Sequence, residues 1–307
     1  MQAIRLVLPA TSANLGPGFD ALGLALALNL TVDAEISHAT DGPPLTIEAT
    51  GRNAERCARV SDNLIFETCA DVLRRHDRAV PRLHLRVHNE IPLGMGLGSS
   101  AAALLAGVTL ANHFGELYWD ARHCMEEACR REGHPDNVAA CALGYMTVSA
   151  DSDSGVVAAT CGEDVPWKFL IALPSASLAT ETARALLPPV YSRHDVVSNL
   201  QRTGLLVSAF GMGRGDLLRV AMQDRLHQPY RMEACPLLPR LLPLAGSDGV
   251  LGVALSGAGP AMLLICDSTA DISAIDARIH EAAADPALEV VETTIAGPAR
   301  HSYPGAS

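Results

Sequence analysis

The feature that most constrains the fold of this chain is a glycine-rich segment near residue 100. In order, it reads Pro92, Leu93, Gly94, Met95, Gly96, Leu97, Gly98, Ser99, Ser100, Ala101 and Ala102. Residues 83–89 before it alternate apolar and polar side chains, which is typical of a half-buried strand. Residues 101–112 after it are mostly helix formers. We therefore predict a strand, a glycine loop and a helix in succession.

This succession suits the binding of a phosphate. Glycine lacks a Cβ atom, so backbone N–H groups can approach a ligand closely. The first N–H groups of a helix have no partner within the helix and carry partial positive charge. Alternatively, the segment is an ordinary turn with Ser99 or Ser100 as the helix N-cap. Three alternating glycines followed by two serines favour the phosphate loop.

Two widespread phosphate-binding motifs fit this loop poorly. The P-loop requires a lysine after its last glycine, and no lysine occurs between Pro92 and Asn112. Residues 96–101 match the loose dinucleotide pattern G-x-G-x-x-A, but that fold needs a preceding strand buried on both faces. Polar side chains instead line one face of the strand predicted over residues 83–89, which disfavours a dinucleotide site.

Length and composition indicate an ordered protein of two domains. The chain has 307 residues, of which 49% are hydrophobic and 19% are charged. Polar residues interrupt the apolar pattern from Cys161 to Pro166, so we predict domains at 1–163 and 164–307. The net charge of −11 argues against nucleic acid or an anionic membrane as the main partner.

Cysteine usage and apolar run length bear on the compartment. The eight cysteines include no Cys-x-x-Cys pair, so neither a zinc site nor a disulfide framework is indicated. Free thiols fit a cytoplasmic protein. The longest apolar run, residues 21–28, is far shorter than the roughly 20 residues of a membrane span.

Two polar segments between apolar elements are candidates for a site. Residues 9–20 are predicted to be a compact loop after a first strand that Pro9 ends. Within it, Asn14 and Asp20 either belong to an ordinary loop or point into a site. Residues 132–137 break a predicted helix and gather two acids, a histidine and an asparagine in one turn. Four polar groups so close together favour a functional role.

These segments together resemble the GHMP small-molecule kinases. Residues 92–102 are similar to the family's phosphate loop, residues 9–20 to its N-terminal motif, and Ser256-Gly257-Ala258-Gly259-Pro260 to its C-terminal glycine motif. Within the family, the chain is most similar to the homoserine kinases. That similarity is carried by residues 132–138, Thr180 with Ala183-Arg184, Leu187-Pro188, and Gln228-Pro229-Tyr230-Arg231.

The resemblance implies a fold and an activity. The fold is α+β with two domains: an N-terminal domain with a left-handed βαβ unit, and a ferredoxin-like C-terminal domain. The implied activity is ATP- and Mg²⁺-dependent phosphorylation of the side-chain hydroxyl of L-homoserine, in threonine biosynthesis, by a homodimer. The alternatives are a GHMP kinase for mevalonate or an isoprenoid intermediate, and a nucleotide-binding protein without catalysis.

On the nucleotide side, the resemblance assigns residues 92–102 to ATP binding. Ser100, or Ser99, is expected to share Mg²⁺ with an acid at the end of the next helix, and Glu132 is the acid we favour. The two other candidates, one to two turns earlier, are expected to be solvated or paired: Glu126 and Glu127. Asn63 resembles the family's adenine contact, although its position before an apolar helix favours a helix cap.

On the acceptor side, homoserine presents a carboxylate, an ammonium and a hydroxyl. Arg184 and Arg231 suit the carboxylate because a guanidinium binds it bidentately, and Asp20 suits the ammonium. Asn14 and Asn137 are expected to hydrogen-bond near the hydroxyl, with His134 and Thr180 beside them. Gly257, in the C-terminal glycine motif, is also expected to contact the substrate. The resemblance implies no dedicated side-chain base. Asp136 could act as one, but we expect it to cap the helix that begins near Val138.

Overall fold

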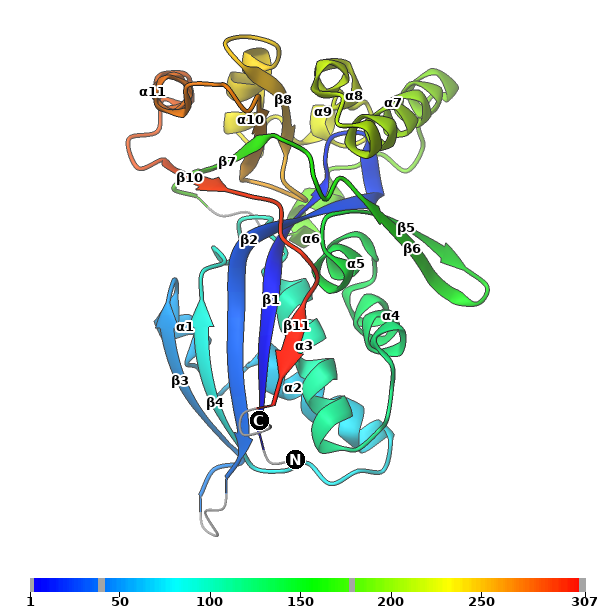
Figure 1. The fold of residues 1–307 in the computed structure, drawn as a ribbon, viewed down its shortest axis with the longest axis vertical. Coiled ribbons are helices and arrows are strands. Elements are labelled where there is room, and N and C mark those ends of the chain that lie inside the picture. Colours follow the sequence, from blue (N-terminus) through cyan, green and yellow to red (C-terminus); the bar gives the residue numbers. More distant parts are fainter. Residues whose placement is uncertain (1–2, 38–41, 177–179, 304–307) are drawn as a thin grey trace.

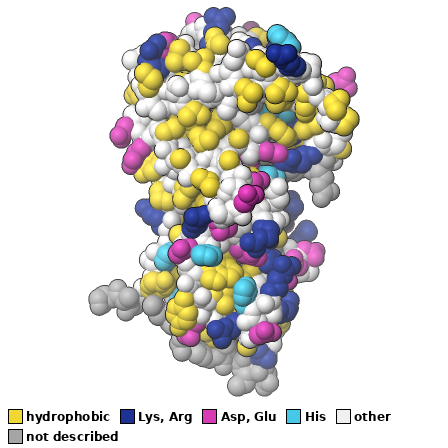
Figure 2. All heavy atoms as spheres, turned by 90° about the vertical axis from the view of Figure 1, so that its right-hand side faces the viewer, with side chains coloured by type: hydrophobic (Ala, Val, Ile, Leu, Met, Phe, Trp, Pro, Cys, Tyr) yellow, Lys and Arg dark blue, Asp and Glu magenta, His cyan; other side chains and the backbone are white. Residues whose placement is uncertain are grey.

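The computed structural model describes residues 3–37, 42–176 and 180–303. Figure 1 shows two domains stacked along the longest axis of the molecule, with both ends of the chain at the foot of the lower, N-terminal domain. Among the described helices, none is long and apolar enough to cross a membrane. On the face drawn in Figure 2, apolar side chains gather over the upper domain and charged side chains of both signs over the lower one.

The N-terminal domain is built on one sheet. Its main path follows the order β11-β1-β2-β4-β3. The bounds are β1 (Ala3–Asn14), β2 (Gly18–Ile36), β3 (Leu45–Gly51), β4 (Leu83–Asn89) and β11 (Arg300–Ser302). A hairpin of β5 (Met146–Ser152) and β6 (Gly155–Cys161) extends the sheet beside β2. The strands β3 and β4 are parallel neighbours joined through α1 (Ala54–Cys57) and α2 (Leu64–Arg75), so the expected βαβ unit is present.

The helices of this domain form a hydrophobic core together with the sheet (Figure 1). They are α2, α3 (Ser99–Phe114), α4 (Ala121–Glu132) and α5 (Asp136–Leu143). The helix α3 follows β4 through the glycine loop, which confirms the predicted succession of strand, loop and helix. Because α3 is apolar on nearly every side, it is buried among its neighbours. Its buried position fixes the loop in front of it.

The C-terminal domain has the strand order of a ferredoxin-like fold. Its sheet runs β10-β7-β9-β8, and every neighbouring pair is antiparallel. The strands are β7 (Lys168–Leu173), β8 (Val250–Leu255), β9 (Met262–Cys266) and β10 (Glu289–Thr293). The helices are α6 (Thr180–Ala185), α7 (Arg193–Met212), α8 (Leu218–Ala221), α9 (Gln228–Arg231), α10 (Leu237–Leu241) and α11 (Ile272–Ala283), with short 3₁₀ turns at 215–217 and 242–244.

The prediction that Pro9 ends the first strand was wrong. Pro9 does not end β1, because a register shift between Pro9 and Ala10 accommodates the proline and the strand continues to Asn14. The disfavoured alternative, a serine cap on α3, is also excluded, since the N-cap is Gly98 in a left-handed conformation without a side-chain bond. The short helix α9 within residues 224–231 was not predicted from the sequence.

One strand was not predicted at all. After the second domain, the chain returns to the first, where β11 pairs with β1 in antiparallel register from Arg5 to Val7. An isolated bridge between Leu26 and Ile295 starts this return. The end of the chain therefore belongs to the sheet of the first domain, although the division at 163/164 assigns it to the second. That division remains a prediction, and so does the left-handed crossover.

Candidate active site

The glycine loop is held by close backbone packing against the second glycine motif. Gly96 has φ +78°, and a Cβ atom there would lie 2.3 Å from the carbonyl oxygen of Ser256. The Ser256 hydroxyl donates to the carbonyl oxygen of Gly96 at 2.8 Å. Gly98 has φ +67°, and its Cβ would lie 1.8 Å from the hydroxyl oxygen of Thr11. Both positions therefore need glycine for their conformation and for the space.

Two cavities meet at the start of α3. The first, of about 80 Å³, is lined by the glycine loop and by most of the residues predicted for the acceptor: Asn14, Asp20, His134, Asn137, Arg184, Arg231 and Gly257, with Glu132 beside them. The second, of about 350 Å³, is lined by Asn63 and by apolar residues of α2 and β4. Gly94, Ser99 and Ser100 line both. The glycine loop thus lies between two cavities, one lined by the residues predicted for the acceptor and the other by Asn63.

Ser100 and Glu132 are hydrogen-bonded to each other across the mouth of the first cavity. The Ser100 hydroxyl donates to Oε2 of Glu132 at 2.8 Å. Burial raises the pKa of the Glu132 carboxyl, and the hydrogen bond from Ser100 partly offsets that rise. A hydroxyl and a carboxylate are oxygen ligands of the kind that Mg²⁺ prefers, so this pair fits the ion.

The two competing acids are engaged elsewhere. Glu126 pairs with Arg122 one helical turn before it, at 2.9 Å. Glu127 is buried and pairs with Arg131 at 2.8 Å and with Arg130. Neither carboxylate lines the first cavity. Of the three acids weighed from the sequence, Glu132 is the one that reaches the loop.

Asn63 is the N-cap of α2, as predicted from its position directly before an apolar helix. Its side-chain oxygen accepts the backbone N–H of Phe66 at 3.1 Å, and its amide donates to two carbonyl oxygens before the helix at 3.4 Å. The residue also lines the second cavity. A contact with adenine remains a prediction.

Asp20 and Arg184, expected to bind different groups of the acceptor, bind each other. The two carboxylate oxygens accept from Nη2 and Nη1 of Arg184 at 2.6 and 3.1 Å, a bidentate pair. Asp20 sits at φ +56° just after a turn, and its backbone N–H donates to the side-chain oxygen of Asn14 at 3.1 Å. The Asn14 amide in turn donates to the carbonyl oxygen of Gly257 at 2.9 Å. Asn14 thereby joins the N-terminal motif to the C-terminal one.

Arg231 is a buried cation that contacts no carboxylate among the described residues. Its side chain is 1% exposed, and it donates to the carbonyl oxygens of Ala183 and Gly257, each at 3.2 Å. In the described part of the chain, no carboxylate oxygen lies within 4.0 Å of its guanidinium, and no hydrogen bond uses Nη2. The ring of Phe19 lies under both arginines, with its centroid 5.6 Å from Cζ of Arg184 and 5.7 Å from Cζ of Arg231.

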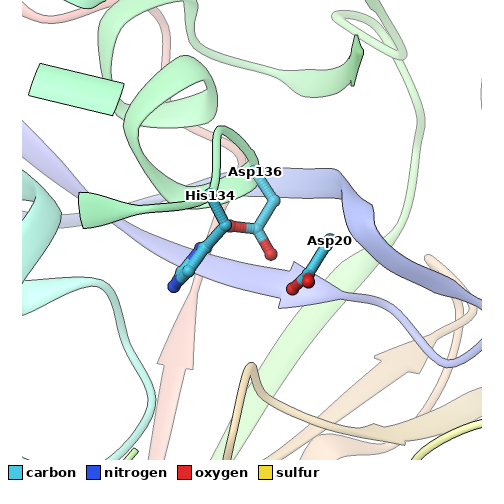
Figure 3. Close-up of side chains that lie close together, drawn as sticks. All are labelled: Asp20, His134 and Asp136. Atoms are coloured by element: carbon cyan, nitrogen blue, oxygen red, sulfur yellow. The ribbon is translucent and has the colours of Figure 1, made fainter. Parts of the chain in front are cut away.

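His134 and Asp136 form a second ionisable pair in the site (Figure 3). Nδ1 of His134 lies 2.6 Å from Oδ1 of Asp136. Burial by itself would lower the pKa of His134, but the hydrogen bond and charge of Asp136 raise it above its ordinary value. The ligand atoms of Asp20, His134 and Asp136 all lie within 4.8 Å of one another. Arg184 and His134 already pair with the two acids, so this cluster differs from the oxygen site at Glu132.

The expected cap at Asp136 was wrong. α5 begins at Asp136 itself, and its N-cap position is Pro135. The Asp136 carboxylate instead accepts the backbone N–H of Asn137 at 2.7 Å and holds His134. The side-chain oxygen of Asn137 accepts from the Thr11 hydroxyl at 2.7 Å. Thr180 opens α6, but its side chain lies outside the described residues, so its place beside the acceptor stays a prediction.

Both halves of the chain match models of one kinase family. Residues 63–145 match the family model described as GHMP kinases N terminal domain, and residues 206–285 match GHMP kinases C terminal. A homoserine kinase from Solibacter usitatus is 47% identical over 262 residues, which cover 85% of this chain and 84% of the relative. The chain belongs to the homoserine kinase branch of the GHMP kinases. Another homoserine kinase, from a Synechocystis strain, is 40% identical and covers 87% of each chain.

Solved structures confirm the GHMP kinase fold. The crystal structure of homoserine kinase from Cytophaga hutchinsonii superposes with a TM-score of 0.83, at 24% identity and 98% coverage of both chains. The L. major mevalonate kinase structure superposes with a TM-score of 0.72, at 13% identity, covering 95% of this chain and 96% of that one. At these identities the likeness establishes the two-domain fold alone.

Some residues of the site were not predicted from the sequence. They are Phe19, Thr11, Asn199, Asp224 and His227. Phe19 and Thr11 belong to the N-terminal motif, so their place in the motif was a usable signal. Nothing local distinguishes the other three from ordinary polar residues.

Proposed function

We propose that this protein transfers the γ-phosphoryl group of ATP to the side-chain hydroxyl of L-homoserine. The observation that carries the proposal is the buried guanidinium of Arg231 beside the phosphate loop. A buried charge needs a counter-charge, and no described carboxylate contacts this guanidinium, although Asp20 and Asp224 act on it at longer range. The carboxylate of an amino-acid substrate supplies it, with Arg184 close by.

The chain's own groups then account for positioning and charge neutralisation. The N–H groups of residues 94–100 bind the phosphates, and Asn14 and Asn137 orient the acceptor hydroxyl. Ser100 and Glu132 would hold Mg²⁺, which when bound offsets the negative charge of the phosphates. His134, held on Asp136, offers its second ring nitrogen for hydrogen bonding. No side chain in this arrangement is required to act as a general base.

Binding of the acceptor replaces the ion pair between Asp20 and Arg184 by two ion pairs with the substrate. The bidentate pair of Asp20 and Arg184 occupies the site in this structure. We propose that the substrate ammonium takes Asp20 and its carboxylate takes Arg184 together with Arg231. Mevalonate carries a carboxylate but no ammonium, so Asp20 favours homoserine over that alternative.

The proposal is tested by an assay of ADP release coupled to a reporter reaction. L-homoserine, mevalonate, galactose and shikimate are offered separately at saturating ATP and Mg²⁺. We expect turnover with homoserine at least 100-fold above the others. Turnover of mevalonate instead would assign the chain to the alternative kinase, and binding of ATP without turnover of any acceptor would make it a non-catalytic nucleotide binder.

Cytoplasmic location, homodimerisation and a place in threonine biosynthesis are part of the same proposal. All eight cysteines are free thiols in the structure, which supports a reducing compartment. The dimer rests on the resemblance to the superfamily. Light scattering is expected to give twice the mass of one chain, and the mass of a single chain would contradict the dimer.

A further inference from the structure

Arg231 is held by a histidine that has no solvent exposure. His227 is fully buried. It is the N-cap residue of α9 and lies one turn before Arg231. Its Nε2 lies 2.8 Å from the carbonyl oxygen of Gly16, and its Nδ1 lies 3.0 Å from Nη1 of Arg231. The imidazole therefore bridges the N-terminal motif and the buried guanidinium.

These two contacts fix the protonation of the ring. A carbonyl oxygen can only accept, so Nε2 must carry the proton that it donates to Gly16. A guanidinium can only donate, so Nδ1 must be unprotonated to accept from Arg231. Burial lowers the pKa of His227, although the charge of Asp224 opposes that shift, and a neutral ring is consistent with both hydrogen bonds.

The ring is itself locked in place. The carboxylate of Asp224 accepts the backbone N–H groups of His227 and Gln228, at 2.9 and 2.6 Å, and the amide of Asn199 at 2.7 Å. Phe19 stacks on the imidazole with a centroid distance of 5.4 Å and an interplanar angle of 30°. The histidine therefore has little freedom to follow Arg231 if the arginine moves.

We propose that His227 is a positioning residue that holds Arg231 ready for the substrate carboxylate by accepting a hydrogen bond at Nδ1. The neutral imidazole satisfies Nη1 without neutralising the guanidinium. A carboxylate in its place would form an ion pair and compete with the substrate. Nη2, which has no partner among the described residues, is left for the acceptor. This inference rests on the proposed function.

Two substitutions test separately the ring nitrogen that accepts a hydrogen bond, Nδ1, and the ring nitrogen that donates one, Nε2. His227→Asn keeps an oxygen near the position of Nδ1, so it can still accept from Arg231. His227→Gln keeps an N–H near the position of Nε2, so it can still donate to Gly16 while the acceptor for Arg231 is displaced. Each variant is assayed with L-homoserine and with 3-aminopropan-1-ol, which is homoserine without its carboxylate. Thermal unfolding confirms that both variants are folded.

We expect His227→Gln to lower kcat/KM for homoserine by about tenfold, mainly through KM, because one hydrogen bond to a charged group is lost. Its kcat/KM for 3-aminopropan-1-ol and its KM for ATP should change less than threefold. His227→Asn should stay within threefold of the unmodified protein for both acceptors. Equal losses with both acceptors, or a His227→Asn variant as impaired as His227→Gln, would overturn the inference.

An Arg231→Ala variant separates this inference from the proposed function. Its preference for homoserine over 3-aminopropan-1-ol should fall at least as far as that of His227→Gln. If Arg231→Ala leaves the preference intact, the carboxylate site of the proposed function is wrong, and the role of His227 is overturned with it. If Arg231→Ala loses the preference and His227→Gln keeps it, the role of His227 alone is wrong.

Discussion

The hydroxyl of Ser100, in the first turn of α3, donates a 2.8 Å hydrogen bond to the carboxylate of Glu132, the last residue of α4. The two residues are 32 positions apart and are brought together by the antiparallel packing of the two helices. The contact places a carboxylate beside the N–H groups of the phosphate loop. It also distinguishes Glu132 from the two acids earlier in α4.

Replacement of Glu132 tests the Mg²⁺ site. Glu132→Gln keeps the size of the side chain and removes its charge, and we expect kcat to fall on the order of 100-fold, with a higher Mg²⁺ requirement. The matched control is Glu126→Gln in the same helix, which removes a pair with Arg122 and should change kcat less than twofold. Steady-state rates over a Mg²⁺ titration make the comparison. Similar rates for both variants would place the metal ligand elsewhere.

Alanine at Gly98 should disable the phosphate loop. The new Cβ would meet the Thr11 hydroxyl at 1.8 Å, so the loop or β1 must move. We expect KM for ATP to rise more than tenfold. The matched control is Gly213→Ala, at nearly the same φ of +64° but with no atom within 4 Å of the added Cβ. It should cost about 1 kcal/mol of unfolding free energy, from backbone strain alone, and leave KM for ATP unchanged.

The ion pair between Asp20 and Arg184 should behave as one unit in acceptor binding. Asp20→Asn and Arg184→Gln are each expected to raise KM for homoserine about tenfold or more, because each removes a charge that the substrate needs. The loss of binding free energy for homoserine in the double variant should be smaller than the sum of the losses in the two single variants, since the residues contact each other directly. KM for ATP provides the control in all three variants. Strict additivity would show that the two residues act independently.

Arg52 and Glu289 link the two domains by a half-exposed ion pair, with Nη1 of Arg52 donating to Oε2 of Glu289 at 2.8 Å. The hydrogen bond from Arg52 lowers the pKa of Glu289. A lowered pKa means that the carboxylate stabilises the folded state above its ordinary pKa and that this contribution is lost as the pH falls through the lowered value. Because both groups are partly exposed, Glu289→Gln should cost less than about 1 kcal/mol at pH 7.

Denaturant unfolding at several pH values measures that contribution. The difference between the unmodified protein and Glu289→Gln should be present at neutral pH and vanish in acid. Arg52→Met should give the same loss with the same pH dependence, because it removes the other half of the pair. A difference that persists in acid would point to packing rather than charge.

The glycine loop and its helix were predictable from the sequence because their signals are local. Alternating glycines, paired serines and an apolar run specify a turn and a buried helix without reference to distant residues. The ferredoxin-like domain followed from the family resemblance and is confirmed by its strand order. By contrast, β11 is three residues long and is stabilised by pairing with β1, so no local sequence pattern predicts it.

The sequence by itself determined which residue types are available for phosphate and amino-acid recognition. The tertiary structure alone decided their partners. Asp20 and Arg184, 164 positions apart, form an ion pair, and His227 meets Gly16 across 211 positions. Which acid in α4 reaches the loop also depends on helix packing rather than on composition. The physical reason is that hydrogen bonds and ion pairs require atoms within about 3–4 Å, and only the packed fold sets such distances between remote segments.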